Sequence, residues 1–296
     1  MKKSFLLRRS IVEQSKDNCE MTTIASLLSA MQYENDYFGS LTVSVDQIGG
    51  TLYGATPDRQ QKKRILNGLH QLRDLQLIQM TELSSSLFEI VLCNFNKKSV
   101  DTGEYVVVLY TNDLINIFRA DTTMDKFKLY NVLTTIIVCM DYSKKIEQTL
   151  RYKFCTTPIY YLANQADMAS RTFTSYVQEL EKLGILYVMH SNGMYNIYKK
   201  MRITNIYCRT ADSVLCGKYA KQINFMSTND FTYDTNFRRK MKQIYNQICK
   251  GKIDYSESVY NELIMYINDA ETAVGYDINI VHEAQQKALK NFAPNM

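Results

Sequence analysis

The sequence QQKKRILNGLHQLRDLQLIQ, residues 60–79, decides how this chain folds. Apolar residues between Ile65 and Leu72 recur at intervals of three or four, which predicts an amphipathic helix with one buried stripe. Upstream, Thr56 suits the capping position of a helix and Pro57 suits its first turn, so we expect the helix to begin there.

The segments around this helix complete a small α+β block. Before it, residues 20–33 carry a helical apolar stripe, Leu41–Val45 alternates as a short strand, and residues 45–53 predict a short helix. After it, Leu77–Leu83 and Leu87–Phe95 predict a β-hairpin that turns through three serines. The order helix, strand, helix, helix and hairpin is typical of a winged helix, in which the second helix of the helix-turn-helix usually enters a DNA groove.

A second block, residues 154–200, repeats this order. A strand-like segment and a short helix that opens at Pro158 precede the stretch SRTFTSYVQELEKLGIL, residues 170–186, which predicts another amphipathic helix. Ile185–His190 and Met194–Lys199 are then expected to form a hairpin, because an Asn-Gly pair at the turn between them is a strong hairpin signal.

Two further helical regions lie outside the repeated order. Residues 124–140 are apolar over most of a helix circumference, so we expect a helix there, capped by Asp121, as a central core element between the two blocks. The last part of the chain matches neither block and predicts helices at 235–250, 256–270 and 277–291, the first of them basic at its start.

The fold expected from these patterns is α+β, mainly α. Two winged-helix (helix-turn-helix) domains in tandem, residues 1–98 and 99–203, are followed by a C-terminal helical region at 204–296. The length of 296 residues and the 46 % hydrophobic composition suit two or three globular domains. Seven scattered cysteines without a C-x-x-C pair, and no apolar run near the roughly 20 residues needed to span a bilayer, predict a cytoplasmic protein without a membrane segment.

The polar faces of the two long helices supply candidate DNA contacts. Lys and Arg neutralise phosphates, and Asn, Gln and Arg form paired hydrogen bonds with base edges. The net charge of +5 permits such a role without requiring it. An ordinary solvated helix face is the alternative. The candidates are Arg59, Gln60, Lys63, Arg64, Asn67 and Gln71 on the first helix, Arg171, Thr174, Ser175, Gln178 and Lys182 on the second, and Lys199 and Lys200 after the second hairpin.

The sequence offers no convincing catalytic motif. It contains no phosphate-binding G-x-x-x-x-G-K-[ST] loop, and its three histidines, His70, His190 and His282, are scattered. A metal site or a histidine-based nucleophilic triad therefore has little to work with. We expect a protein that is not an enzyme and needs no cofactor or metal.

Residues 60–79 and 170–186 each combine a recognition-type helix, a leucine-rich end and a hairpin. In this they resemble the tandem winged-helix replication initiators of plasmids and related mobile elements and, more loosely, the N-terminal modules of primosomal DnaD-type proteins. The resemblance covers about residues 20–200. It implies a protein that binds repeated origin sequences in double-stranded DNA and recruits host replication proteins. The chain departs from many such initiators in its modest charge and weakly basic hairpins.

Two other functions use the same helices. A winged-helix transcriptional regulator would place them on a promoter, and an interaction adaptor would use them as surfaces for a partner or for a second copy in a homodimer. The DNA sequence bound and the role of the C-terminal region stay open at this point.

Overall fold

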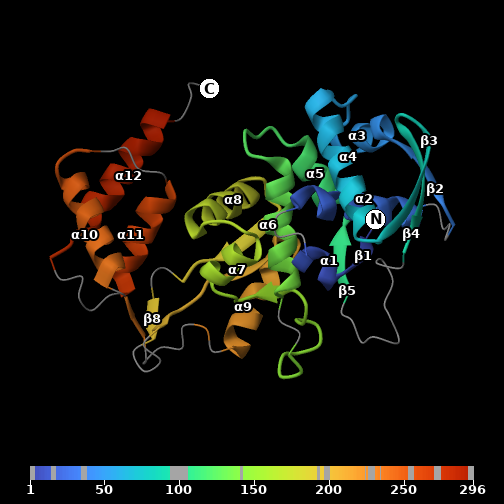
Figure 1. Ribbon diagram of the computed structural model, residues 1–296. Coiled ribbons are helices and arrows are strands. Elements are labelled where there is room, and N and C mark those ends of the chain that lie inside the picture. Colours follow the sequence, from blue (N-terminus) through green and yellow to red (C-terminus); the bar gives the residue numbers. More distant parts are fainter. Residues whose placement is uncertain are drawn as a thin grey trace. The chain divides into compact units, whose positions relative to one another are not determined.

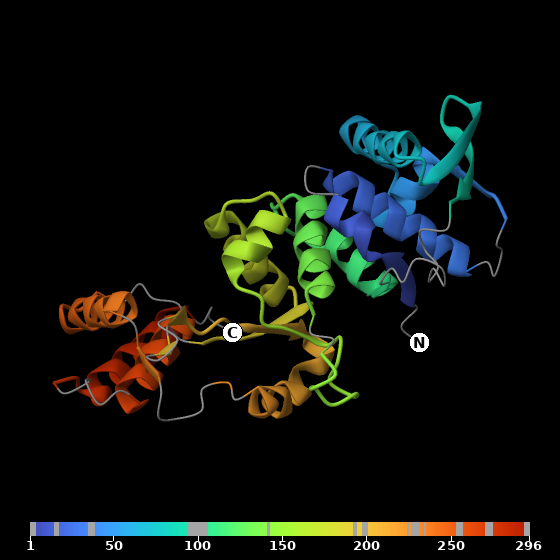
Figure 2. The ribbon, with the colours of Figure 1, turned by 60° about the horizontal axis from the view of Figure 1, so that its bottom comes forward.

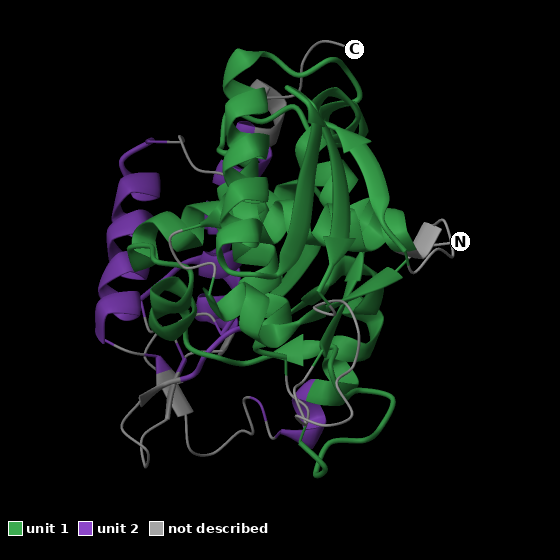
Figure 3. Cartoon of the chain, turned by 45° about the vertical axis from the view of Figure 1, so that its right-hand side comes forward, with its two compact units in different colours: residues 1–189, 206–219 green, residues 190–205, 220–296 purple. Residues whose placement is uncertain are grey.

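The computed structural model has an α+β fold that is mainly helical. Its residues gather into two compact units, one made of residues 1–189 and 206–219 and the other of residues 190–205 and 220–296 (Figure 3). The structure describes residues 4–14, 18–34, 39–93, 106–140, 143–191, 194–196, 201–223, 225, 231–233, 235–252, 257–269 and 275–292.

The first unit contains the first predicted block in the expected order. Two strands form the hairpin, and the strand before the helix pair adds to it, so that the antiparallel sheet runs β2-β4-β3. The hairpin turns after Ser84, as predicted. The elements are α2 (Cys19–Glu34), β2 (Leu41–Ser44), α3 (Val45–Tyr53), α4 (Arg59–Asp74), β3 (Ile78–Ser84) and β4 (Leu87–Leu92).

Helix α4 begins two residues later than predicted. The carboxylate of Asp58 accepts a hydrogen bond from the backbone N–H of Gln61, and the Gln61 side chain accepts one from the Asp58 N–H. This reciprocal capping box satisfies two N–H groups that the helix leaves open, so Asp58 and not Thr56 is the cap. Pro57 lies before the helix and is buried, and its ring packs so closely on Gly49 that a Cβ there would overlap it.

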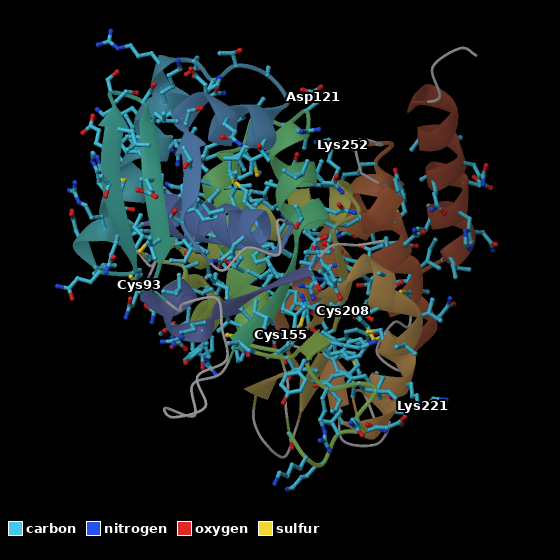
Figure 4. All side chains as sticks on the ribbon, turned by 90° about the vertical axis from the view of Figure 1, so that its right-hand side faces the viewer. Cys93, Asp121, Cys155, Cys208, Lys221 and Lys252 are labelled. Atoms are coloured by element: carbon cyan, nitrogen blue, oxygen red, sulfur yellow. The ribbon has the colours of Figure 1, made fainter. Side chains whose placement is uncertain are left out.

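The second block has the same order of elements but a different last strand. Its sheet runs β6-β10-β7, with Cys155 and Cys208, both labelled in Figure 4, on neighbouring strands. The elements are β6 (Phe154–Cys155), α7 (Ile159–Gln165), α8 (Ser170–Lys182), β7 (Leu186–Met189) and β10 (Ile206–Arg209). The apolar helix before this block is α6 (Lys126–Val138). Its cap is Asp125, whose carboxylate accepts hydrogen bonds from the N–H groups of Phe127 and Lys128, so the predicted cap at Asp121 is wrong.

The predicted second hairpin is therefore wrong in its return strand. Strand β8 (Met194–Asn196) pairs with β9 (Met201–Arg202) and β11 (Phe231–Tyr233), whereas β7 pairs with β10. A central strand needs side chains that tolerate burial on both faces, and all four residues of β10 are buried. The Asn-Gly pair that suggested a tight turn, residues 192–193, lies outside the described residues.

Helix α6 is the centre of the first unit. Every residue from Leu129 to Val138 is buried. Its neighbours include α1, α2 and α5 from one part of the unit and α7 and α8 from the other (Figures 1 and 2). One continuous hydrophobic core therefore includes residues of both blocks, and the prediction that this helix lies between them is confirmed.

The start of the chain also joins the two blocks. Strand β1 (Ser4–Arg8) pairs with β5 (Val106–Tyr110), which follows the predicted domain boundary at residue 98. The first two predicted domains consequently share a sheet as well as a core. The remaining helices of this region are α1 (Arg9–Gln14), α5 (Thr111–Arg119) and α9 (Ser213–Gln222), the last spanning the unit boundary.

The second unit contains the three helices predicted for the end of the chain. They are α10 (Thr235–Cys249), α11 (Glu257–Asp269) and α12 (Ile278–Phe292). Met241, Leu263 and Val281, one from each helix, are fully buried in a core of their own. The small sheet β11-β8-β9 belongs to the same unit.

Candidate nucleic-acid interface

The exposed face of α4 carries four of the predicted DNA-binding residues. Ile65 and Leu69 mark the buried face of the helix, and steps of about 100° per residue place Arg59, Lys63 and Asn67 opposite them. These three side chains and that of Gln60 are exposed. None of the four makes a hydrogen bond or ion pair to the part of the chain that the structure describes. Their donors are available to a ligand.

Arg64, predicted to share that face, instead holds the fold together. Its Nε lies 2.6 Å from Glu20 Oε1 and its Nη1 lies 2.8 Å from Asp125 Oδ2. Its guanidinium also stacks 4.0 Å above the centre of the Phe127 ring. Burial opposes the charged form, but the hydrogen bonds to Asp125 and Glu20 outweigh it and raise the pKa of Arg64. The guanidinium therefore ties α4 to α2 and to the first turn of α6.

Gln71 is also turned inward, so its predicted place on the exposed face is wrong as well. Its Nε2 donates to Asn18 Oδ1 at 2.8 Å, and its Oε1 is buried. Both Arg64 and Gln71 lie on the flank of the helix next to α2, roughly 90° or less from the nearest buried position. A polar residue on that flank contacts the neighbouring helix before it reaches solvent.

Helix α8 presents a less available set of groups. Thr174 Oγ1 donates to the carbonyl of Ser170 at 2.8 Å, and Ser175 Oγ donates to the carbonyl of Arg171 at 3.2 Å. Because each hydroxyl already donates its hydrogen to a carbonyl of the preceding turn, it cannot donate to DNA, although its oxygen can still accept a hydrogen bond. Neither side chain is fully exposed.

The three other predicted DNA contacts of α8 face solvent. Arg171, Gln178 and Lys182 are exposed, and Lys182 Nζ is 3.8 Å from Glu179 Oε2, a loose pair on the surface. Such a pair contributes little, so Lys182 remains available to a phosphate. Lys199 and Lys200 lie outside the described residues.

The hairpin of the first block brings no positive charge. The segment from Ile78 to Leu92 contains Glu82 and Glu89 but neither Lys nor Arg. Leu83, near its tip, has 53 % of its surface exposed. Phosphate contacts by this hairpin are disfavoured, so α4 is the better candidate surface.

The described residues show neither a metal centre nor a membrane span. No three His, Cys, Asp or Glu side chains among them gather closely enough to hold an ion. None of the helices in that same part of the chain has both the length and the apolar surface needed to cross a bilayer. In comparisons with known proteins, no protein-family model, curated protein or solved structure matches this chain.

Proposed function

We propose that this protein binds double-stranded DNA, without catalysis, through two winged-helix modules in tandem, and that α4 reads the base sequence. The observation that carries the proposal is a set of four exposed polar side chains on α4 that have no partner among the described residues, namely Arg59, Gln60, Lys63 and Asn67. Two cations and two amides on one helix face match the needs of phosphate binding and of base-edge recognition.

The order of elements supports the winged-helix interpretation. In both blocks a strand precedes a helix pair, and that strand pairs with the last strand of the block, as in the sheets β2-β4-β3 and β6-β10-β7. The helix pair and the hairpin then belong to one small body, from which the second helix projects a polar face. We assign α8, with its exposed Arg171, Gln178 and Lys182, a phosphate-positioning role.

The biological role proposed is that of a replication initiator or replication accessory protein of a plasmid, phage or other mobile element. It rests on the resemblance carried by residues 60–79 and 170–186. Origin repeats and host replication proteins would then be the partners.

A transcriptional regulator is the second candidate function, because the same exposed face of α4 could bind a promoter equally well. The position of the bound DNA site relative to the gene separates these two functions. The third candidate function is that of an adaptor, in which the α4 face would bind a protein.

A salt titration of DNA binding tests the proposal. The full chain is titrated onto labelled duplexes from the DNA around its gene, at salt concentrations from about 50 to 200 mM. Lys63→Ala is compared with Lys145→Ala, which removes the same charge from an exposed position outside α4 and α8. Asn67→Ala probes base recognition.

We expect affinity for a preferred duplex to fall with salt, and Lys63→Ala to lower the log–log slope by about one. Asn67→Ala should reduce the preference for the cognate sequence by about 1–3 kcal/mol, and Lys145→Ala should change neither quantity. Duplex binding that is absent, or that does not respond to salt, would contradict the proposal. If the Lys63→Ala protein kept its biological activity although its DNA affinity fell, the adaptor function would be favoured.

A further inference from the structure

The second unit contains a hollow of about 630 Å³ beside α10. Among the described residues, its lining consists of cations and tyrosines together with Thr235, Asn246 and Gly275, and it includes no carboxylate. The groups that matter are Arg238, Arg239, Lys242, Tyr245, Tyr266 and Tyr276.

The cations follow one side of α10. Residues three or four apart share a helix face, which brings Arg239 and Lys242 together away from the buried Met241. Both are exposed, and neither makes an ion pair with any described part of the chain. Lys240, by contrast, is 2.8 Å from Glu262 Oε2 and does not line the hollow. Arg239 and Lys242 thus bring positive charge to the hollow that no carboxylate of the described residues neutralises by an ion pair.

The tyrosines form a connected group of rings. The ring centres of Tyr245 and Tyr276 are 4.7 Å apart, and those of Tyr276 and Tyr266 are 5.8 Å apart. Tyr266 is buried, whereas Tyr245 and Tyr276 are partly exposed. The hydroxyl of Tyr245 accepts a hydrogen bond from the backbone N–H of Asp277 at 2.8 Å, which holds the ring in place. Preorganised rings lose little entropy when a flat ligand stacks on them.

We propose that this hollow binds single-stranded nucleic acid, with Arg239 and Lys242 on the phosphates and an unpaired base stacked on Tyr276 and Tyr245. A basic groove combined with aromatic rings is the arrangement that single-strand binding requires. In a duplex the bases are stacked on one another and cannot reach such rings. The proposal goes beyond duplex recognition by α4 and does not depend on it.

Anisotropy titrations of the full chain with a labelled oligothymidylate of about 16 nucleotides provide the test. One variant combines Arg239→Ser and Lys242→Ser. Its control combines Lys250→Ser and Lys252→Ser, two exposed residues just after α10, of which Lys252 is labelled in Figure 4. Tyr276→Leu removes the ring and Tyr276→Phe keeps it. Duplex binding is measured in parallel.

The Arg239 and Lys242 variant should lose roughly tenfold or more in affinity for the oligothymidylate and lower the salt slope by about 1.4. Tyr276→Leu should lower the affinity by about 5- to 150-fold with the salt slope unchanged, whereas Tyr276→Phe should bind like the natural protein. The lysine control should change affinity less than about twofold, apart from a general charge effect. Affinity for duplex DNA should stay constant in all four variants. A failure of the single-strand proposal is therefore distinguishable from a failure of the proposal that α4 binds duplex DNA.

Two outcomes would overturn the inference. One is that the natural protein does not bind the oligothymidylate. The other is that Tyr276→Leu binds like Tyr276→Phe, while polyglutamate competes as well as oligothymidylate does, which would make the hollow a surface for acidic peptides. Circular dichroism of each variant confirms that the helices are intact, so that a loss of affinity reports on the hollow.

Discussion

At the scale of single residues, the angle around α4 separates a cation that can contact DNA from one that stabilises the fold. Lys63 and Arg64 are adjacent in sequence but about 100° apart on the helix. Lys63 is exposed, whereas Arg64 has 24 % of its side chain exposed and bonds two carboxylates, those of Glu20 and Asp125. Replacing Arg64 should therefore affect the stability of the fold, whereas replacing Lys63 should affect DNA binding.

We predict that Arg64→Ala lowers the free energy of unfolding by about 1–3 kcal/mol, because two partly buried carboxylates lose their partner. Lys63→Ala should change that free energy by less than about 0.5 kcal/mol while weakening DNA binding. Urea denaturation of both variants measures the difference. Equal stabilities would show that the contacts of Arg64 contribute nothing to the fold.

A second prediction concerns alkaline pH. Burial, followed by the charge of Glu20, raises the pKa of Cys19 to about 12, and burial raises that of Tyr53 to about 12. Each group titrates at lower pH in the unfolded chain, near 8.5 for Cys and 10 for Tyr. The unfolded state therefore loses protons first, so stability is complete below about pH 8.5 and falls as pH rises toward 12.

Denaturation midpoints at about pH 8 and pH 10.5 should show this loss. In Cys19→Ala the decrease between the two pH values should be smaller than in the natural protein, because one of the groups whose pKa folding raises is gone. Comparing the decrease of the midpoint in the two proteins cancels the contribution of the titrating groups that they share. An identical decrease in both proteins would contradict the raised pKa of Cys19.

At the scale of elements, two helical glycines differ in whether a neighbouring helix packs closely against them. In α4, a Cβ on Gly68 would lie 2.7 Å from Ile24 Cγ1 and 2.9 Å from the carbonyl oxygen of Glu20, both in α2. In α3, a Cβ on Gly50 would meet nothing within 4 Å. The first glycine is required by packing and the second is not.

Gly68→Ala should therefore destabilise the protein by about 1–3 kcal/mol, because α2 and α4 must move apart. Gly50→Ala, the matched control, should raise stability by up to about 1 kcal/mol through the better helix propensity of alanine. Thermal unfolding of the two variants gives the sign directly. If Gly68→Ala raised the stability instead, α2 and α4 could move apart at little cost in free energy.

At the scale of the whole molecule, the two predicted blocks belong to one compact unit and share a hydrophobic core that includes α6. Leu133, in the middle of that helix, is fully buried. Leu133→Ala should lower the free energy of unfolding by about 2–5 kcal/mol. Because the core is continuous, hydrogen-exchange protection should fall in both α2 and α8. Val214→Ala, at a side chain 91 % exposed, is the control and should change neither.

If protection fell only in α8, the two blocks would unfold separately and the predicted boundary at residue 98 would describe the molecule better. A fragment of residues 1–98 offers the same test from the other side. It would expose the surface of α2 that α6 covers and lack the β5 partner of β1, so we expect it to be poorly folded.

Local pattern was enough to predict most of the elements and part of the candidate site. Periodicity in residues 60–79 located α4, and the same reasoning found α2, α3, α6, α8 and the three C-terminal helices. The exposed positions Arg59, Lys63 and Asn67 followed from the angle between residues on a helix. The signal D-x-x-Q at Asp58–Gln61 was also present and would have located the start of α4 correctly.

The amino-acid pattern was sufficient to predict most of the helices, the first hairpin and the buried stripe of each predicted helix, because these depend on residues within one or two turns of each other. The partner of β7, the contacts of Arg64 with two carboxylates and the shared core around α6 became known from the three-dimensional arrangement alone. Each of these depends on which distant segment occupies a neighbouring position. Strand pairing, ion pairing and burial between segments are set by that competition in space, which spacing along the chain does not record.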